Sequence, residues 1–353
     1  MAALVALAYT IHDTGLRTIG HYFRRIGWWW VMVVVLEVAI TTLDAIAIRA
    51  FMSPEHHKVK LRSTLLAQLA GRAVNAVTPS GNLGEALKIS VLTEHVSQSR
   101  AVATILLYNV ASFSVELGVV AIAAPFMVLL VPMPGALQAL MLVTAAVCLV
   151  LSLGLYALVR RGMLVSFGRF LRRIRVLSQA RYERWEPRLT GVDDKVRLVA
   201  GARRRDRWIG IAAVITSRFT SMSLSFMILH AVGESLTLGF VAAYIVGGFG
   251  IYMVSSLVPM GLGISEGGNY KLFQALGENP ARGVTLVLAR RVTLIMYAAI
   301  GVVLVTASET VKRARARSTE VVPTTTGDEV AGAGGLIVSL PPTVTSPAAD
   351  ARE

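Results

Sequence analysis

The chain has 353 residues, of which 54% are apolar and 16% are charged. Soluble domains carry about a quarter charged residues, so this composition excludes an ordinary soluble protein. The formal net charge of +14 would suit a nucleic-acid-binding protein, but fifteen of the basic residues fall within residues 160–207, between two apolar runs. We therefore expect no nucleic-acid partner.

Residues 1–26 are predicted to form an N-terminal interfacial segment. We do not expect a cleaved signal peptide here, because no basic stretch precedes the apolar part. A helix needs about 20 apolar residues to cross a bilayer. Six later runs approach or exceed this length: 28–50, 101–131, 137–158, 209–232, 236–257 and 283–307. The fold class predicted from them is all-α, a polytopic membrane helical bundle.

The basic loop 160–207 sets the predicted topology. Loops rich in Lys and Arg remain in the cytoplasm, so we place this loop inside and the protein in the cell (plasma or inner) membrane. Bases at 312–317 suggest that the C-terminus is also cytoplasmic. The transmembrane domain is predicted to cover 27–309, and the Thr- and Pro-rich tail 310–353 is predicted to be disordered.

Two segments, 78–85 and 258–266, interrupt apolar runs with Pro and Gly and then continue beside a Glu. Irregular backbone at membrane depth is tolerated only where protein buries it or where it lines a polar cavity. Two such breaks in matching places of two halves point to a transporter's binding site. We therefore predict two broken or re-entrant helices in two related halves. The residues expected to break the structure are Pro79, Gly81, Gly84, Pro259, Gly261 and Gly263.

Charged residues occur in or beside the apolar segments, where one charge costs roughly 2.5–3.5 kcal/mol at the bilayer centre. They must face one another or a wet cavity. They are Glu37, Asp44, Arg72, Glu85, Lys88, Glu116, Arg218, Glu266, Lys271, Arg290 and Arg291.

The first break carries the clearest candidate site. Arg72 and Asn75 share a helical face before it, and Glu85 and Lys88 share one after it. Arg grips phosphate bidentately, and a helix N-terminus attracts anions. The predicted substrate-binding residues are Arg72, Asn75, Glu85, Lys88, Glu266 and Arg290. Two structural alternatives stay open: helix capping by Asn82 and by Ser265 with Glu266, and an Arg72–Glu85 ion pair.

Other charged residues have simpler expected roles. Glu37 and Asp44 could relay protons or cations, although pairing with a neighbouring base is the stronger expectation. Arg290 and Arg291 point to different faces, so at most one should reach a cavity. Glu116 and Arg218 are expected to be packing partners within the bundle. We expect no catalytic residues, no metal site at the isolated His56-His57 pair and no cofactor.

The pattern Arg72-x-x-Asn75-x-x-x-Pro79-x-x-x-x-Gly84-Glu85-x-x-Lys88, with Pro259-x-Gly261-x-Gly263-x-x-Glu266, resembles the flippase-like membrane region of lysylphosphatidylglycerol synthases. The resemblance covers roughly residues 20–308. It implies an integral membrane protein that handles lipids: aminoacylated phospholipids, or polyprenyl-linked sugars and hopanoid-type lipids. The residues quoted would be the shared core.

Two departures qualify the resemblance. The family often has an acidic-basic pair where this chain has Tyr108-Asn109. The soluble aminoacyltransferase domain of the full synthases is also missing, so we expect a stand-alone member that cannot aminoacylate a lipid unaided.

The function expected is non-enzymatic transport, in which an anionic phospholipid or lipid-linked sugar moves between leaflets. Two alternatives are an accessory subunit that partners a membrane enzyme of lipid or glycan synthesis, and a membrane-embedded lipid-modifying enzyme.

Overall fold

The structure is a computed structural model that describes residues 21, 24–77, 83–132, 134–161, 204–256, 258, 261–293 and 296. The chain divides into two compact units, Met1–Ser308 and Glu309–Glu353, and the described residues all belong to the first. The predicted tail, most of the basic loop and most of the interfacial segment lie outside the described residues.

Five helices are long and apolar enough to cross a membrane. They are α3 (Trp29–Phe51), α6 (Gln98–Leu130), α7 (Gly135–Arg161), α10 (Arg204–Ala231) and α11 (Leu238–Ser255). They match five of the six predicted runs to within a few residues. The sixth run begins in a helix over 280–293, and beyond residue 293 only residue 296 is described. Every element of the described part of the chain is helical, which confirms the all-α fold class.

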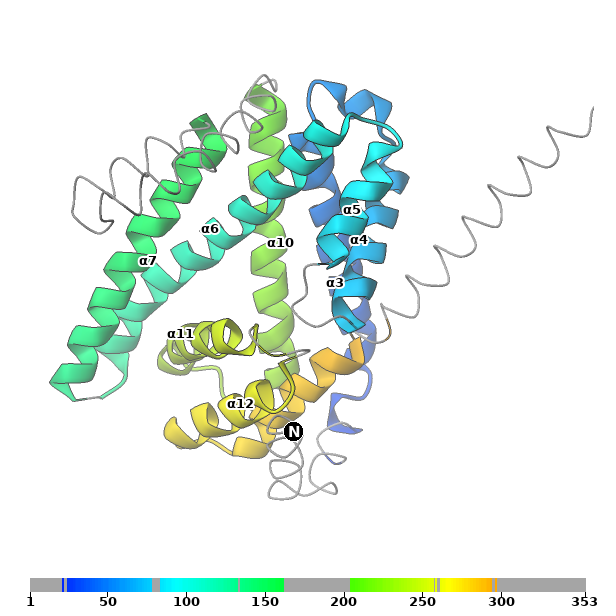
Figure 1. The fold of residues 1–353 in the computed structure, drawn as a ribbon. Helices are drawn as coiled ribbons and strands as arrows, with labels where there is room; N and C mark the ends of the chain where they lie inside the picture. Colours follow the sequence, from blue (N-terminus) through cyan, green and yellow to red (C-terminus); the bar gives the residue numbers. More distant parts are fainter. Residues whose placement is uncertain are drawn as a thin grey trace, which may run out of the picture. The chain divides into compact units, whose positions relative to one another are not determined.

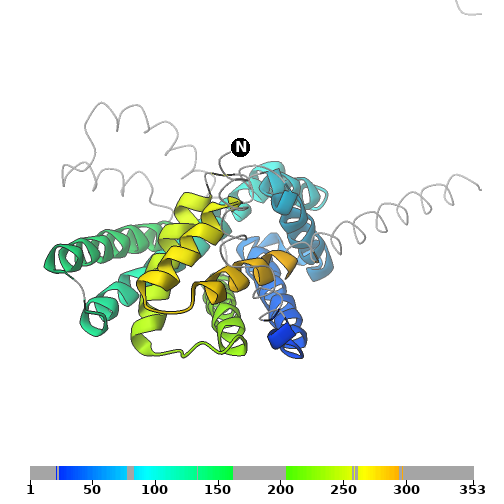
Figure 2. The same cartoon turned by 90° about the horizontal axis from the view of Figure 1, so that it is seen from below.

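The first broken element is a hairpin of two helices, α4 (Leu61–Val77) and α5 (Leu83–Thr93), which lie side by side in Figures 1 and 2. Gly71 of α4 and Gly84 of α5 let the two helices approach each other closely. A Cβ on Gly84 would lie 2.1 Å from the carbonyl oxygen of Gly71. Gly84 therefore serves close packing within a helix, whereas we had expected it to open the backbone.

The second broken element joins α11 to α12 (Ile264–Ala275). The two helices run antiparallel, because a Cβ on Gly247 would meet Leu272 and one on Gly268 would meet Ile251. Helix 280–293 then turns back along α12, where Gly283 lies against Phe273. Gly261 and Gly263 have φ of 61° and 76°, a region that side chains disfavour. These two glycines therefore do allow the turn, as predicted.

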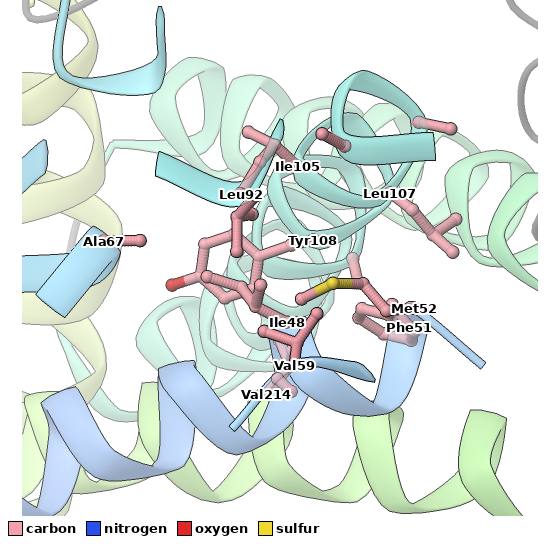
Figure 3. Close-up of a cluster of buried hydrophobic side chains, with 14 of the residues drawn as sticks. Ile48, Phe51, Met52, Val59, Ala67, Leu92, Ile105, Leu107, Tyr108 and Val214 are labelled. Atoms are coloured by element: carbon pink, nitrogen blue, oxygen red, sulfur yellow. The ribbon is translucent and has the colours of Figure 1, made fainter. Parts of the chain in front are cut away.

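Helix α10 lies against α3 and α6, α6 and α7 form an antiparallel pair, and α11 packs against α6 and α12. One apolar cluster joins α3, α4, α5, α6 and α10 (Figure 3). Figure 3 shows Ile48 and Phe51 of α3, with Met52 directly after that helix, beside Tyr108 of α6. This packing holds the first hairpin, α3, α6 and α10 together.

Candidate functional site

A cavity of about 570 Å³ lies between the two halves of the bundle. It is lined by residues from α3, α4, α6, α10, α11, α12 and helix 280–293. Both broken elements contribute, since Arg72 comes from α4 and Ser265 from α12. The polar lining is Glu37, Arg72, Glu116, Arg218, Ser221, Ser255, Ser265, Asn269, Arg290 and Arg291. Aromatic and aliphatic side chains form the rest of the wall, among them Phe226, Tyr244, Ile245, Phe249, Tyr252 and Leu286.

Arg72 enters the cavity from the last turns of α4 and is held by α3. Its guanidinium donates to the Glu37 carboxylate at 2.8 Å and to the Thr41 hydroxyl at 2.7 Å. Glu37 is 5% exposed, so the pair is nearly dehydrated on its α3 side. The expected pairing of Glu37 with a neighbouring base is therefore confirmed, and the ion pair of Arg72 is made with α3.

Asp44, two turns further along α3, is the centre of a buried network. Its carboxylate accepts hydrogen bonds from Gln68 at 3.0 Å, from Ser217 at 2.6 Å and from Arg218 at 2.8 Å. Glu116 of α6 lies 3.6 Å from the same guanidinium on the cavity side. The pairing of Asp44 with a base was predicted, as was packing of Glu116 and of Arg218 within the bundle. The contact between Glu116 and Arg218, and the place of these two residues in the cavity wall, were not predicted.

Arg290 and Arg291 both line the cavity, so the prediction that at most one reaches it was wrong. Arg291 binds the Glu266 carboxylate at 2.6 Å. Arg290 instead donates to the hydroxyls of Ser221 and Ser225 and to the Ser221 carbonyl. Both reach the cavity because helix 280–293 runs along α12 on one side and contacts α10 on the other.

Glu266 is fully buried and caps its own helix. Its carboxylate accepts a hydrogen bond from the Gly263 amide at 2.9 Å, while Arg291 neutralises it. Helix α12 begins at Ile264 with Gly263 as its N-cap. The expectation that Ser265 caps the helix was therefore wrong, because the Ser265 hydroxyl binds Ser255 at 3.1 Å.

The remaining predicted residues form a separate cluster beside the first break. Glu85 binds Lys88 at 2.8 Å, Asn109 at 3.1 Å and Asn75 at 3.4 Å. Asn75 in turn accepts from the Gly84 amide at 2.7 Å. Lys88 is 4% exposed and lies over the Tyr108 ring. These four polar side chains tie α4, α5 and α6 together, and the described cavity lining does not include them.

The two halves repeat one arrangement. In the first, Glu85 on the short helix contacts Asn109, 24 residues further along the chain, on the long helix that follows. In the second, Glu266 on short α12 contacts Arg291 on the helix that follows. The Tyr108-Asn109 pair thus takes the place in the first half that Arg290-Arg291 takes in the second.

Of the predicted site residues, the structure brings Arg72 and Arg290 to the cavity, with Glu266 buried directly behind Arg291. Pro79, Gly81 and Pro259 lie outside the described residues, as does Asn82. Glu116 and Arg218 also line the cavity, a location that sequence reasoning did not foresee. Their positions deep within apolar spans could have indicated that they face a polar cavity. No group of three or more His, Cys, Asp or Glu that could hold a metal occurs among the described residues.

Apolar spans around a cavity lined with buried ion pairs define a multi-pass membrane protein. A family model described as the lysylphosphatidylglycerol synthase TM region matches residues 1–301. The chain therefore belongs to this family, and the match is to the membrane region of these synthases. Comparison with curated proteins gave no match, and comparison with solved structures gave none either.

Proposed function

We propose that this protein binds the anionic headgroup of a lipid in the cavity and moves that lipid between leaflets without chemical change. The proposal rests on which groups contact Arg290, compared with the other arginines of the cavity. Three cavity arginines have a carboxylate within 2.8 Å: Arg72 with Glu37, Arg218 with Asp44 and Arg291 with Glu266. Arg290 has none in the described part of the chain.

An arginine without a carboxylate is costly inside an apolar bundle. Charge at membrane depth is expensive unless it is paired or solvated, and hydroxyl and carbonyl partners supply dipoles and no charge. A phosphate would supply the missing charge and could accept two parallel hydrogen bonds from the guanidinium. The Ser221 hydroxyl beside Arg290 also lines the cavity and could donate to a further phosphate oxygen.

The shape of the lining supports a lipid more than a small soluble anion. The cavity lining combines the charged side chains of Arg72 and Arg290 with apolar ones, among them Phe226, Ile245 and Phe249. Pockets for amphiphiles combine these two surfaces. The lipid is either an anionic phospholipid or a lipid-linked sugar.

The N-terminus of α12 adds to the field in the cavity. The N-terminal turn of α12 carries Ser265 on the cavity wall, and half-helix N-termini favour anionic groups in transporters. We place the basic loop 160–207 in the cytoplasm on the same grounds as before, and we propose the cell membrane as the location. Asn75, Glu85 and Lys88 would hold the first hairpin against α6 while the lipid passes.

The test is lipid exchange in proteoliposomes that contain a fluorescently labelled phosphatidylglycerol, quenched from outside with dithionite. Arg290→Gln should slow exchange at least about tenfold, the factor that about 1.4 kcal/mol of lost binding produces. Arg49→Gln is the matched control, because Arg49 also donates to a backbone carbonyl, that of Val59, and lies outside the cavity. Unchanged exchange by folded Arg290→Gln protein would refute the proposal.

A further inference from the structure

Glu116 is held more loosely than the other carboxylates around the cavity. The Glu37, Asp44 and Glu266 carboxylates each lie within 2.8 Å of a guanidinium nitrogen, and their side chains are 6%, 4% and 0% exposed. The Glu116 side chain is 25% exposed, and its one ion pair in the described part of the chain is with Arg218 at 3.6 Å. Asp44 already binds that guanidinium at 2.8 Å. Glu116 is therefore the carboxylate that would lose least on becoming neutral.

The charges around the cavity cancel when every group is ionised. Among the described residues, four arginines line the cavity, and four carboxylates line it or pair with these arginines from behind the wall. They are Arg72, Arg218, Arg290 and Arg291, with Glu37, Asp44, Glu116 and Glu266. The empty cavity is thus electrically neutral.

A bound anionic headgroup changes this balance. A phosphate on Arg290 would give each cavity arginine an anion of its own, which leaves the Glu116 carboxylate as a surplus negative charge. Net charge inside an apolar bundle is costly, and a like charge nearby disfavours the ionised form of a carboxyl group. Uptake of one proton by Glu116 removes the surplus.

The groups that face Glu116 come from three helices packed against α6. Arg218 of α10, Asp44 of α3 and Tyr252 of α11 lie close enough to interact with it electrostatically. Only Arg218 among them is a base, and the Asp44 carboxylate adds a like charge that favours protonation of Glu116.

The described titratable groups of α5 and α7, which also pack against α6, are engaged elsewhere. Lys88 of α5 binds Glu85 at 2.8 Å. On α7, Cys148 lies in an apolar cluster and Tyr156 packs against another. They therefore supply no further base to Glu116.

We propose that Glu116 is a proton-binding site, which takes up one proton when an anionic headgroup binds in the cavity, so that the lipid and the proton cross together. The proposal rests on the proposed function, because Arg290 would hold the headgroup. The carboxylate becomes a carboxylic acid with a proton from the water on one side, and it returns that proton to the water on the other. A pH difference across the membrane would then drive the lipid toward the alkaline side.

The first test counts the protons that accompany binding. Purified full-length protein in detergent is titrated calorimetrically with dioctanoyl phosphatidylglycerol or farnesyl phosphoryl hexose, in buffers of different ionisation enthalpy. Both probes are phosphate diesters, so their own charge is constant near neutral pH, and they represent the two possible lipid sources. We expect uptake that approaches one proton per lipid, and a dissociation constant that rises with pH by up to about tenfold per unit.

A neutral residue at position 116 should remove this linkage. Glu116→Gln should bind the probes at least as tightly as the natural protein, without proton uptake and without dependence on pH. A purely structural role for Glu116 predicts the opposite: weaker binding with unchanged proton uptake. Arg218 keeps Asp44 at 2.8 Å in this variant, and Glu116→Met is a second neutral replacement should the amide disturb folding.

Glu278→Gln is the matched control. The Glu278 carboxylate lies 3.7 Å from the Arg282 guanidinium, which buried Glu234 binds at 2.9 Å, and its side chain is 30% exposed. This geometry is close to that of Glu116, but Glu278 lies outside the cavity. Its replacement should leave proton uptake as in the natural protein.

The second test follows transport in proteoliposomes with a pH difference across the membrane. The natural protein should enrich labelled phosphatidylglycerol in the leaflet that faces the alkaline side, whereas Glu116→Gln should distribute it equally. Equal distribution by the natural protein would overturn the joint crossing of lipid and proton.

The outcomes separate this inference from the proposed function. Binding that needs Arg290 but takes up no proton overturns the inference and leaves the proposed function intact. Proton uptake that persists in Glu116→Gln overturns the assignment to Glu116. If neither probe binds, or if binding is unchanged in Arg290→Gln, the proposed function fails and this inference fails with it.

Discussion

Asp44 offers the sharpest test of how the buried charges hold the bundle together. Three donors from two other helices converge on its carboxylate: Gln68 of α4, and Ser217 and Arg218 of α10. Asp44→Ala would leave the Arg218 guanidinium without its close counter-charge. The substitution should therefore destabilise the protein far more than the loss of an exposed charge.

The size of the effect follows from burial. Removing one partner of a buried ion pair costs about 3–5 kcal/mol. Arg218 retains 19% side-chain exposure and has Glu116 at 3.6 Å, so we expect the lower end, about 3 kcal/mol. Arg218→Ala should cost a similar amount, and the double variant should cost about 2 kcal/mol less than the sum, because both changes remove one interaction.

The assay is equilibrium unfolding in mixed micelles with increasing sodium dodecyl sulfate, followed by far-ultraviolet circular dichroism. Lys58→Ala is the control, because its pair with Glu55 is exposed and such pairs contribute less than about 1 kcal/mol. Equal small losses for Asp44→Ala and Lys58→Ala, or strictly additive costs in the double variant, would refute the reasoning.

Three further predictions test packing, capping and topology. Gly84→Ala places a Cβ 2.1 Å from a backbone oxygen and should sharply reduce the monodisperse fraction on size-exclusion chromatography. Gly135→Ala is the control, because open space surrounds Gly135. Equal monodisperse fractions for the two variants would contradict the close approach of α4 and α5. Thr237→Ala removes the hydroxyl that caps α11 and should cost about 1 kcal/mol in the same unfolding assay, and no loss would show that the cap is dispensable. With Cys148→Ala as background, a cysteine at Gln179 should react with an impermeant maleimide only after the membrane is opened, and labelling of intact cells would place the basic loop outside.

The sequence was enough to predict the spans because a run of apolar residues is a local pattern. Runs of apolar residues gave five helices to within a few residues, and the Pro and Gly interruptions marked both broken elements. Gly261 and Gly263 were read correctly because a turn of positive φ has a recognisable residue preference. Gly84 was misread, since close helix packing selects the same residue and only the position of Gly71 distinguishes the two.

The partners in the cavity could not be predicted from the sequence to the same degree. Arg72 pairs with Glu37, a contact between residues 35 positions apart, and nothing in the local sequence chooses between Glu37 and Glu85. Arg290 and Arg291 were assigned to different faces by helical periodicity, which is correct for an isolated helix. That rule failed because neighbouring helices lie on both sides of this one. Ser265 was misassigned as a cap because the helix starts one residue before it.

The lengths of the short helices have a consequence for the surrounding bilayer. At 1.5 Å per residue, α5 with 11 residues and α12 with 12 are about 17 and 18 Å long, little more than half of a hydrocarbon layer of about 30 Å. Lipids in contact with such elements must compress or tilt to match them. Membranes of shorter acyl chains should therefore accommodate this protein with less deformation than thick, sterol-rich ones.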